Sequence, residues 1–222
     1  MKTNSKALRE VVYNKIIDDI SDGKIVPGEK LNERQLAKKY NVSRTPIREA
    51  LFQLEKVGVV AFDKVQGVIV KKITAKQFEE ILNIISVLEG YAVETIVANG
   101  ITSNDLTNII QLGEKLEMNA KNKEYFKFAK NNRKFHEHLV KKTKNLALQE
   151  LLKELNRKVY TGGLSVPYYI DEYEKKHKII IDAISKGRSK EAGIAMKQHN
   201  QDIIKYIVET LKNLKGTNAI SF

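Results

Sequence analysis

Two arginines four residues apart, Arg44 and Arg48, lie in a segment whose residue types suit DNA reading. Ser43 precedes them and is expected to cap a helix that begins at Arg44. Pro46 fits the first turn of that helix, where backbone N–H groups have no intrahelical partner. Arg44, Thr45 and Arg48 would then face outward, so the N-terminal end of this helix is expected to enter the DNA major groove.

An arginine fork can meet guanine O6 and N7 together, which is worth about 1–3 kcal/mol of discrimination between bases. Thr45 would contact phosphate or a thymine methyl, and Ser43 is also expected among the DNA-contacting residues. Arg34 lies near the start of the preceding helix and would reach the backbone or a base edge, unless it pairs with a neighbouring glutamate. Gly67 would let a hairpin tip approach the minor groove, and Lys64 would meet phosphates there or simply be exposed.

The four histidines form a second set with possible chemistry: His136, His138, His177 and His199. His177 and His199 flank Gly187, and in an antiparallel helix pair they would lie ~15 and ~18 Å from the bend, nearly level. Asn132 lies one turn before His136, whereas His138 is expected to face solvent. Three imidazoles with an oxygen donor suit a divalent metal such as Zn²⁺ or Ni²⁺. Ordinary core or surface histidines are the alternative.

Hydrophobic periodicity predicts helices over about 6–21, 33–40 and 44–57. Two β-branched segments, 59–62 and 68–70, then indicate a hairpin, and Thr74 is expected to cap the next helix. Six more helices are expected at about 75–98, 103–119, 122–143, 146–165, 168–186 and 189–214, with a Gly- and Pro-containing stretch at 162–167. The fold class is therefore mostly α, an N-terminal winged helix-turn-helix followed by an all-helical antiparallel bundle of about six helices.

These elements predict a DNA-binding domain over 1–73, a helical domain over 74–215 and a disordered tail over 216–222. The net charge of +12 favours a polyanionic partner, although lysine-rich solvated faces explain such an excess equally well. The chain has no cysteine. It shows neither a signal-like N-terminus nor a run of 18 apolar residues, so a cytoplasmic protein with no membrane partner is expected.

The first third of the chain resembles the winged helix-turn-helix repressors of the GntR family. The resemblance rests on three strings: Pro27–Ala37 (PGEKLNERQLA), Val42–Leu51 (VSRTPIREAL) and Leu54–Gly58 (LEKVG). It implies DNA contacts by Arg34, Arg44, Thr45, Arg48 and Gly67. One recognition helix reads few base pairs, so a homodimer on a palindromic operator in double-stranded DNA is expected.

The later helices resemble the FCD-type effector domain of the FadR subfamily in three segments: Asn132–His136 (NRKFH), His177–Gly187 and Met196–His199 (MKQH). The resemblance implies that His136, His177 and His199 hold a metal together with the residue at position 132. It also implies that a small carboxylate metabolite completes the coordination. The family commonly has aspartate where Asn132 stands and arginine where Ile85 stands. Three explanations stay open for the missing arginine: the effector is less acidic, another cation such as Arg133 substitutes, or ligand sensing has been lost.

We expect a ligand-responsive transcriptional regulator of the repressor type, and no enzyme. Two alternatives remain at the level of sequence. The first is a constitutive DNA-binding protein whose bundle serves only dimerisation, for which Asn132 and Ile85 are the best arguments. The second is a metal-dependent enzyme that uses the histidines to activate water, for which the sequence offers no HExxH and no nucleophile with a base.

Overall fold

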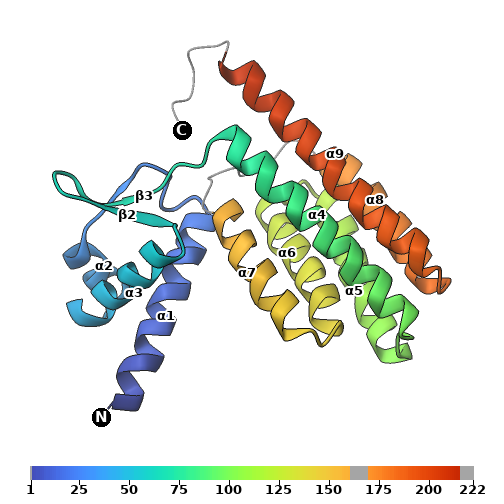
Figure 1. Ribbon diagram of the computed structural model, residues 1–222, viewed down its shortest axis with the longest axis horizontal. Helices are drawn as coiled ribbons and strands as arrows, with labels where there is room; N and C mark the ends of the chain where they lie inside the picture. Colours follow the sequence, from blue (N-terminus) through green and yellow to red (C-terminus); the bar gives the residue numbers. More distant parts are fainter. Residues whose placement is uncertain (1, 161–169, 216–222) are drawn as a thin grey trace. The chain divides into compact units, whose positions relative to one another are not determined.

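The computed structural model describes residues 2–160 and 170–215, and the chain forms two compact units (Figure 1). The first unit contains the residues through Phe78 and the end of helix α7 (Leu146–Tyr160) from Glu154 onward. The second contains Glu79–Lys153 and the described residues from Ile170 onward. Helix α4 (Ala75–Ala98) begins in the first unit and continues through the second.

The first unit is a three-helix core with a small sheet. Its elements are α1 (Lys2–Ser21), β1 (Lys30–Leu31), α2 (Glu33–Tyr40), α3 (Arg44–Lys56), β2 (Val60–Asp63) and β3 (Gly67–Val70). The strands are antiparallel in the order β1-β3-β2. Ile16, Ile47, Leu51 and Leu54 are completely buried between the helices, and Val60 closes the core from the sheet. This is the expected winged helix-turn-helix.

Strand β1 is absent from the sequence-based prediction. Two residues are too few for an alternating pattern to be visible, so the strand depends on its partner. Gly28 N donates to Val70 O (2.8 Å) and Val70 N donates to Glu29 O (3.0 Å), which brings the segment onto the edge of β3. Tertiary hydrogen bonding, rather than local propensity, makes this strand.

The second unit is helical, with α4, α5 (Ser103–Lys121), α6 (Tyr125–Lys142), the start of α7, α8 (Ile170–Ser185) and α9 (Ser189–Lys215). Helix α5 contacts α6 and α8, and α8 contacts α9. Phe135, Leu116, Ile180 and Met196 are buried in its core. Parts of the expected helices at 161–165 and 168–169, the stretch at 162–167 and the expected tail at 216–222 lie outside the described residues.

Helix α4 begins at the expected cap. Gln77 N donates to Thr74 Oγ1 (3.2 Å), and Thr74 N donates to Gln77 Oε1 (3.0 Å), which together form a reciprocal capping box. By length and composition alone, Lys76–Ala98 could cross a membrane, although 44% of its most apolar window is buried within the protein. Core helices of globular proteins commonly share these features. The helix also carries a buried glutamate, Glu89.

Candidate nucleic-acid interface and metal centre

Helices α2 and α3 form the helix-turn-helix, and local capping explains where each begins and ends. Asn32 Oδ1 accepts hydrogen bonds from Arg34 N (2.9 Å) and Gln35 N (3.2 Å) at the start of α2. Asn41 ends α2 in the left-handed conformation (φ 55°). Val42 then packs against the core, and Ser43 is the extended residue before α3.

The expectation that the Ser43 side chain caps α3 is wrong. Ser43 occupies the N-cap position, with φ −70° and ψ 168°, but its side chain makes no capping hydrogen bond. Pro46, at the third helical position, has no N–H to donate, which removes the usual partner of an N-cap hydroxyl. The Ser43 side chain is exposed, and so are Arg44 and Thr45.

Arg44 and Arg48 project from the first two turns of α3 with 69% and 65% of their side chains exposed, and one carboxylate lies beside both. Glu33 Oε2 lies 3.0 Å from Arg44 Nη2, and Glu33 Oε1 lies 3.9 Å from Arg48 Nε. In the sequence, Glu33 is only one of the two neighbouring glutamates, with Glu29, that could pair with Arg34. The observed contact instead crosses from α2 to α3, so it depends on helix packing that the local pattern does not encode.

Arg48 contacts one ring of a stacked aromatic pair, Phe52 and Phe62. The Arg48 guanidinium lies 5.7 Å from the centroid of the Phe52 ring, a cation–π contact. Phe52 stacks on Phe62 of β2, with centroids 4.8 Å apart and planes within 11°. The stack links the recognition helix to the hairpin, so the two candidate DNA-contacting elements hold a defined relation to each other.

The hairpin tip is built by a turn that leaves its side chains in solvent. Asp63 Oδ1 accepts hydrogen bonds from Val65 N (2.8 Å) and Gln66 N (2.7 Å). These two backbone bonds hold the pKa of Asp63 below its usual value. Gly67 closes the turn at φ +84°, a conformation that favours glycine. Lys64 is exposed at this tip, and Arg34 is exposed on α2.

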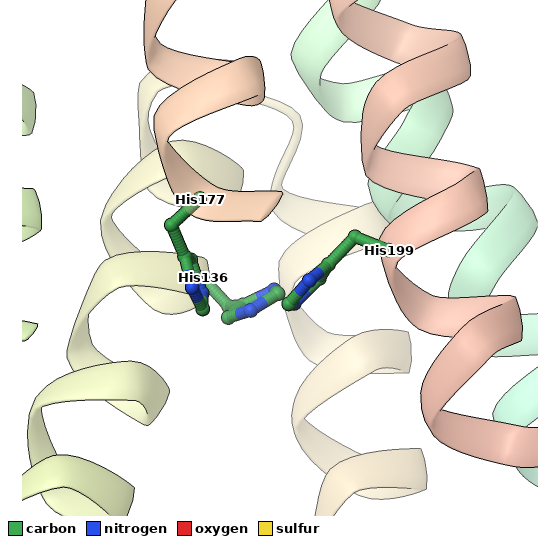
Figure 2. Close-up of side chains that lie close together, drawn as sticks. All are labelled: His136, His177 and His199. Atoms are coloured by element: carbon green, nitrogen blue, oxygen red, sulfur yellow. The ribbon is translucent and has the colours of Figure 1, made fainter. Parts of the chain in front are cut away.

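The second candidate site is a cluster of three histidines from three helices (Figure 2). His136 comes from α6, His177 from α8 and His199 from α9, and one ring nitrogen from each lies within 4.8 Å of the others. All three are buried. Burial, followed by the neighbouring His177 and His136, lowers the pKa of His199 well below its usual value, which favours the neutral, ligating form.

A close helix crossing helps to build the cluster. A Cβ placed on Gly90 of α4 would lie 3.0 Å from the Gly193 carbonyl oxygen of α9, and one placed on Gly193 would lie 2.9 Å from the Gly90 oxygen. Ser86 Oγ also donates to Lys197 O (3.1 Å) across the same pair of helices. The absence of side chains at this crossing lets α4 approach α9, and the buried Glu89 of α4 contacts His136 and, on α9, Asn200.

One oxygen of Glu89, Oε2, lies at hydrogen-bond distance from His136 Nδ1 (2.7 Å) and accepts a hydrogen bond from Asn200 Nδ2 (2.9 Å). No role could be assigned to this residue from the sequence. Glu89 is one of several acids in a largely apolar helix, and nothing in its neighbourhood along the chain reveals a partner 47 residues away.

The donor set fits a divalent cation. Among the described residues, His136 Nε2 and Asn132 Oδ1 are buried with no hydrogen-bond partner. Tetrahedral Zn–N bonds of about 2.0–2.1 Å place ligand nitrogens roughly 3.4 Å apart. The 4.8 Å limit on the nitrogen separations is thus within a small side-chain rotation of that geometry. Asn132 lies one turn before His136 on α6, as expected.

Arg133 and His138 lie near the cluster but do not belong to the set of candidate metal ligands. Arg133 is partly exposed, with Nε 4.0 Å from Glu137 Oε1 on the same helix. His138 is half-buried rather than solvent-facing, because α6 packs against α5 on that side. Burial and then Lys142 lower the pKa of His138. Ile85, where the resemblance would place arginine, is a buried apolar residue.

Comparisons with known proteins connect both sites to one class of protein. The model of the gntR family of bacterial regulatory proteins matches residues 8–70, and that of the FCD domain matches residues 80–202. The uncharacterized HTH-type transcriptional regulator YdhC of Bacillus subtilis (strain 168) is 33% identical over 209 residues, covering 89% of this chain and 91% of the relative.

Two further similarities extend along nearly the whole chain. A probable D-xylose utilization operon transcriptional repressor of Paenarthrobacter nicotinovorans is 24% identical over 225 residues, covering 98% of this chain and 96% of the relative. The solved structure of McbR/YncC from E. coli has a TM-score of 0.84 at 23% identity and covers 92% of this chain and 98% of that one. At that identity, the structural likeness establishes the fold alone.

Proposed function

Because the chain belongs to the GntR family of transcriptional regulators and carries an FCD domain, we propose that it is a repressor of the FadR subfamily. In this proposal a homodimer binds a palindromic operator, and a small organic acid bound at or near a metal in the helical domain modulates that binding. The division of labour follows the expected domains, 1–73 for DNA and 74–215 for effector and dimerisation. The known relatives are transcriptional regulators, so the chain acts on DNA without catalysing a reaction.

The observation that carries the DNA-binding proposal is the pair of exposed guanidinium groups at the start of α3. Arg44 and Arg48 would read guanines, with Thr45 and Ser43 contacting phosphate or a methyl group. Arg34 would add a contact from α2. Lys64 and Gly67 at the hairpin tip would approach the minor groove. Because the proposed target is operator DNA, we expect the protein to function in the cytoplasm.

The histidine cluster supports the metal part of the proposal. His136, His177 and His199 would hold Zn²⁺ or Ni²⁺, with the Asn132 oxygen as a fourth donor. When bound, the ion supplies a positive centre that can accept the carboxylate of an effector. Because Asn132 is neutral, this centre keeps more positive charge than one with an aspartate ligand, and Arg133 is the nearby cation proposed to assist.

A dimer needs a surface, and helix α4 offers one. Ile84, Val87 and Tyr91 lie on one face of α4 at spacings of three and four residues, and each has more than half of its surface exposed. We assign this face to a second copy of the chain, because reading two half-sites requires two recognition helices. Val87→Lys should shift sedimentation toward the monomer, whereas Met118→Lys on α5, an equally exposed apolar residue, should not.

Selection of binding sites from a random pool of duplexes tests the DNA proposal. Full-length protein at physiological salt should enrich two inverted half-sites centred about one helical turn apart, roughly 10 base pairs. Enrichment of no sequence would refute it.

Thermal unfolding against a panel of metals and organic acids tests the second part. A true ligand at a hundredfold excess over its dissociation constant stabilises by about 2.7 kcal/mol. If neither metals nor acids stabilise the protein, and its operator affinity is the same with and without them, the bundle serves dimerisation only. That alternative is favoured by Asn132 and Ile85.

A further inference from the structure

Glu89 is a buried acid whose presence in the apolar helix α4 needs an explanation. Only 5% of its side chain is exposed, and burying a carboxylate is costly unless hydrogen bonds compensate. Its Oε2 has two such partners, the ring of His136 on α6 and the amide of Asn200 on α9. Asn200 directly follows His199, so the carboxylate touches one candidate ligand and the neighbour of another.

The direction of the contact with His136 follows from the chemistry of the Glu89 carboxylate. Asn200 can only donate through Nδ2, so Glu89 Oε2 acts as an acceptor. An ionised carboxylate has no hydrogen to give, so the same oxygen accepts from His136 Nδ1 as well, and the ring hydrogen then resides on Nδ1. The lone pair of His136 is then on Nε2, the atom that is buried without a hydrogen-bond partner among the described residues.

We propose that Glu89 is a positioning residue of the metal centre, which holds His136 in the tautomer and ring orientation that present Nε2 to the ion. This inference rests on the proposed metal binding. The residue also supplies a negative charge that the neutral Asn132 does not. A ligating histidine whose second nitrogen donates to a carboxylate is a stronger donor, and loss of such a partner typically lowers metal affinity by about 10- to 100-fold.

The tautomer can be tested without metal. In metal-free full-length protein, ¹⁵N spectra of the histidine rings should show His136 with a protonated Nδ1 and an unprotonated Nε2. Glu89→Leu, which has no acceptor, should lose this preference. A wild-type protein whose His136 carries its hydrogen on Nε2 would overturn the proposal, whether or not any metal binds.

Metal titration supplies the second readout. Zn²⁺ and Ni²⁺ are titrated into wild type, Glu89→Gln, Glu89→Leu and the control Glu80→Gln, an exposed acid on the same helix. Glu89→Gln keeps the size and an acceptor but not the charge, so its affinity should fall by about tenfold, and that of Glu89→Leu by more. Glu80→Gln should match wild type.

The outcomes separate the two ideas. If wild type binds neither ion, the proposed metal function fails and the ring spectra alone decide the role of Glu89. If wild type binds and Glu89→Gln binds within about twofold of it, the positioning role fails while the metal site stands. Should Glu89→Leu not fold, the ring spectra of the wild type and the metal titration of Glu89→Gln still provide the two measurements.

Discussion

Substituting alanine for Gly193 tests whether the close crossing of α4 and α9 is required. The new Cβ would lie 2.9 Å from both the Gly90 oxygen and the Glu94 Cβ. Ordinary carbon contacts are about 3.5–4.0 Å, so the helices must separate by several tenths of an ångström. Overpacking of this kind costs about 1–3 kcal/mol. Helix propensity acts in the opposite direction, because alanine is about 1 kcal/mol better than glycine in a helix interior.

Gly113→Ala is the matched control. Its Cβ would approach only the end of the Ile181 side chain, which can rotate away, so the propensity gain should be largely retained. The two variants should therefore differ by roughly 1–3 kcal/mol, a difference in melting temperature on the order of 5 °C for a chain of this size. Far-UV circular dichroism on heating measures it.

Gly193→Ala should also weaken Zn²⁺ or Ni²⁺ binding, because moving α9 from α4 draws Asn200 and His199 away from Glu89. A Gly193→Ala protein that melts at or above the temperature of Gly113→Ala would refute the reasoning, since propensity would then outweigh the contact. If Gly193→Ala loses stability as expected but binds metal as tightly as the wild type, the crossing of α4 and α9 contributes to packing and not to the metal site.

Three further outcomes are expected. Alanine at Arg44 or Arg48 should cost about 1–3 kcal/mol on the selected operator and much less on random duplex, measured by fluorescence anisotropy; equal losses on both would mean phosphate rather than base contacts. Glu33→Gln removes the carboxylate beside both arginines, so affinity for random duplex should rise and the operator-to-random ratio should fall; an unchanged ratio contradicts this role. Burial would raise the pKa of Asp19, but hydrogen bonds from Lys39 and Tyr40 lower this pKa below its usual value. The ionised Asp19 therefore stabilises the fold at a pH above the usual pKa of an aspartate, and this stabilisation is lost on acidification. Urea unfolding should show the stability advantage of wild type over Asp19→Asn at neutral pH and its loss as the pH falls below the usual pKa of an aspartate, about 3.9; an advantage that persists in acid contradicts the assignment.

Much of the fold could be predicted because helical periodicity and capping residues are local signals. Thr74 and Gln77, three residues apart, mark the start of α4, and the hairpin follows from two β-branched segments around a glycine turn. Strand β1 could not be predicted, because Lys30 and Leu31 pair only through β3. The Ser43 side chain failed as a cap for a reason visible in the sequence, namely the proline three positions on.

The candidate sites divide in the same way. Arg44 and Arg48 were placed by one helix start, and the level of His177 and His199 followed from counting residues on either side of a bend. Glu33 and Glu89 could not be found, because each contacts its partners across helices whose rotation is set by packing. Periodicity tells which face of a helix is buried but does not tell which buried residues meet.

Regulation by an effector requires more than a pocket, because a ligand shifts an equilibrium only by its difference in affinity for two conformations. Glu89 indicates where such a difference could arise. It joins His136 to α4, and α4 continues the chain directly from β3 of the DNA-binding unit. A metal or effector that moves the His136 ring must therefore either move Glu89 with it or break a buried hydrogen bond. If Glu89→Gln retains metal binding yet its operator affinity no longer responds to metal, the signal passes through this contact. If the response persists, another contact between the bundle and α4 carries it, such as the Ser86–Lys197 hydrogen bond.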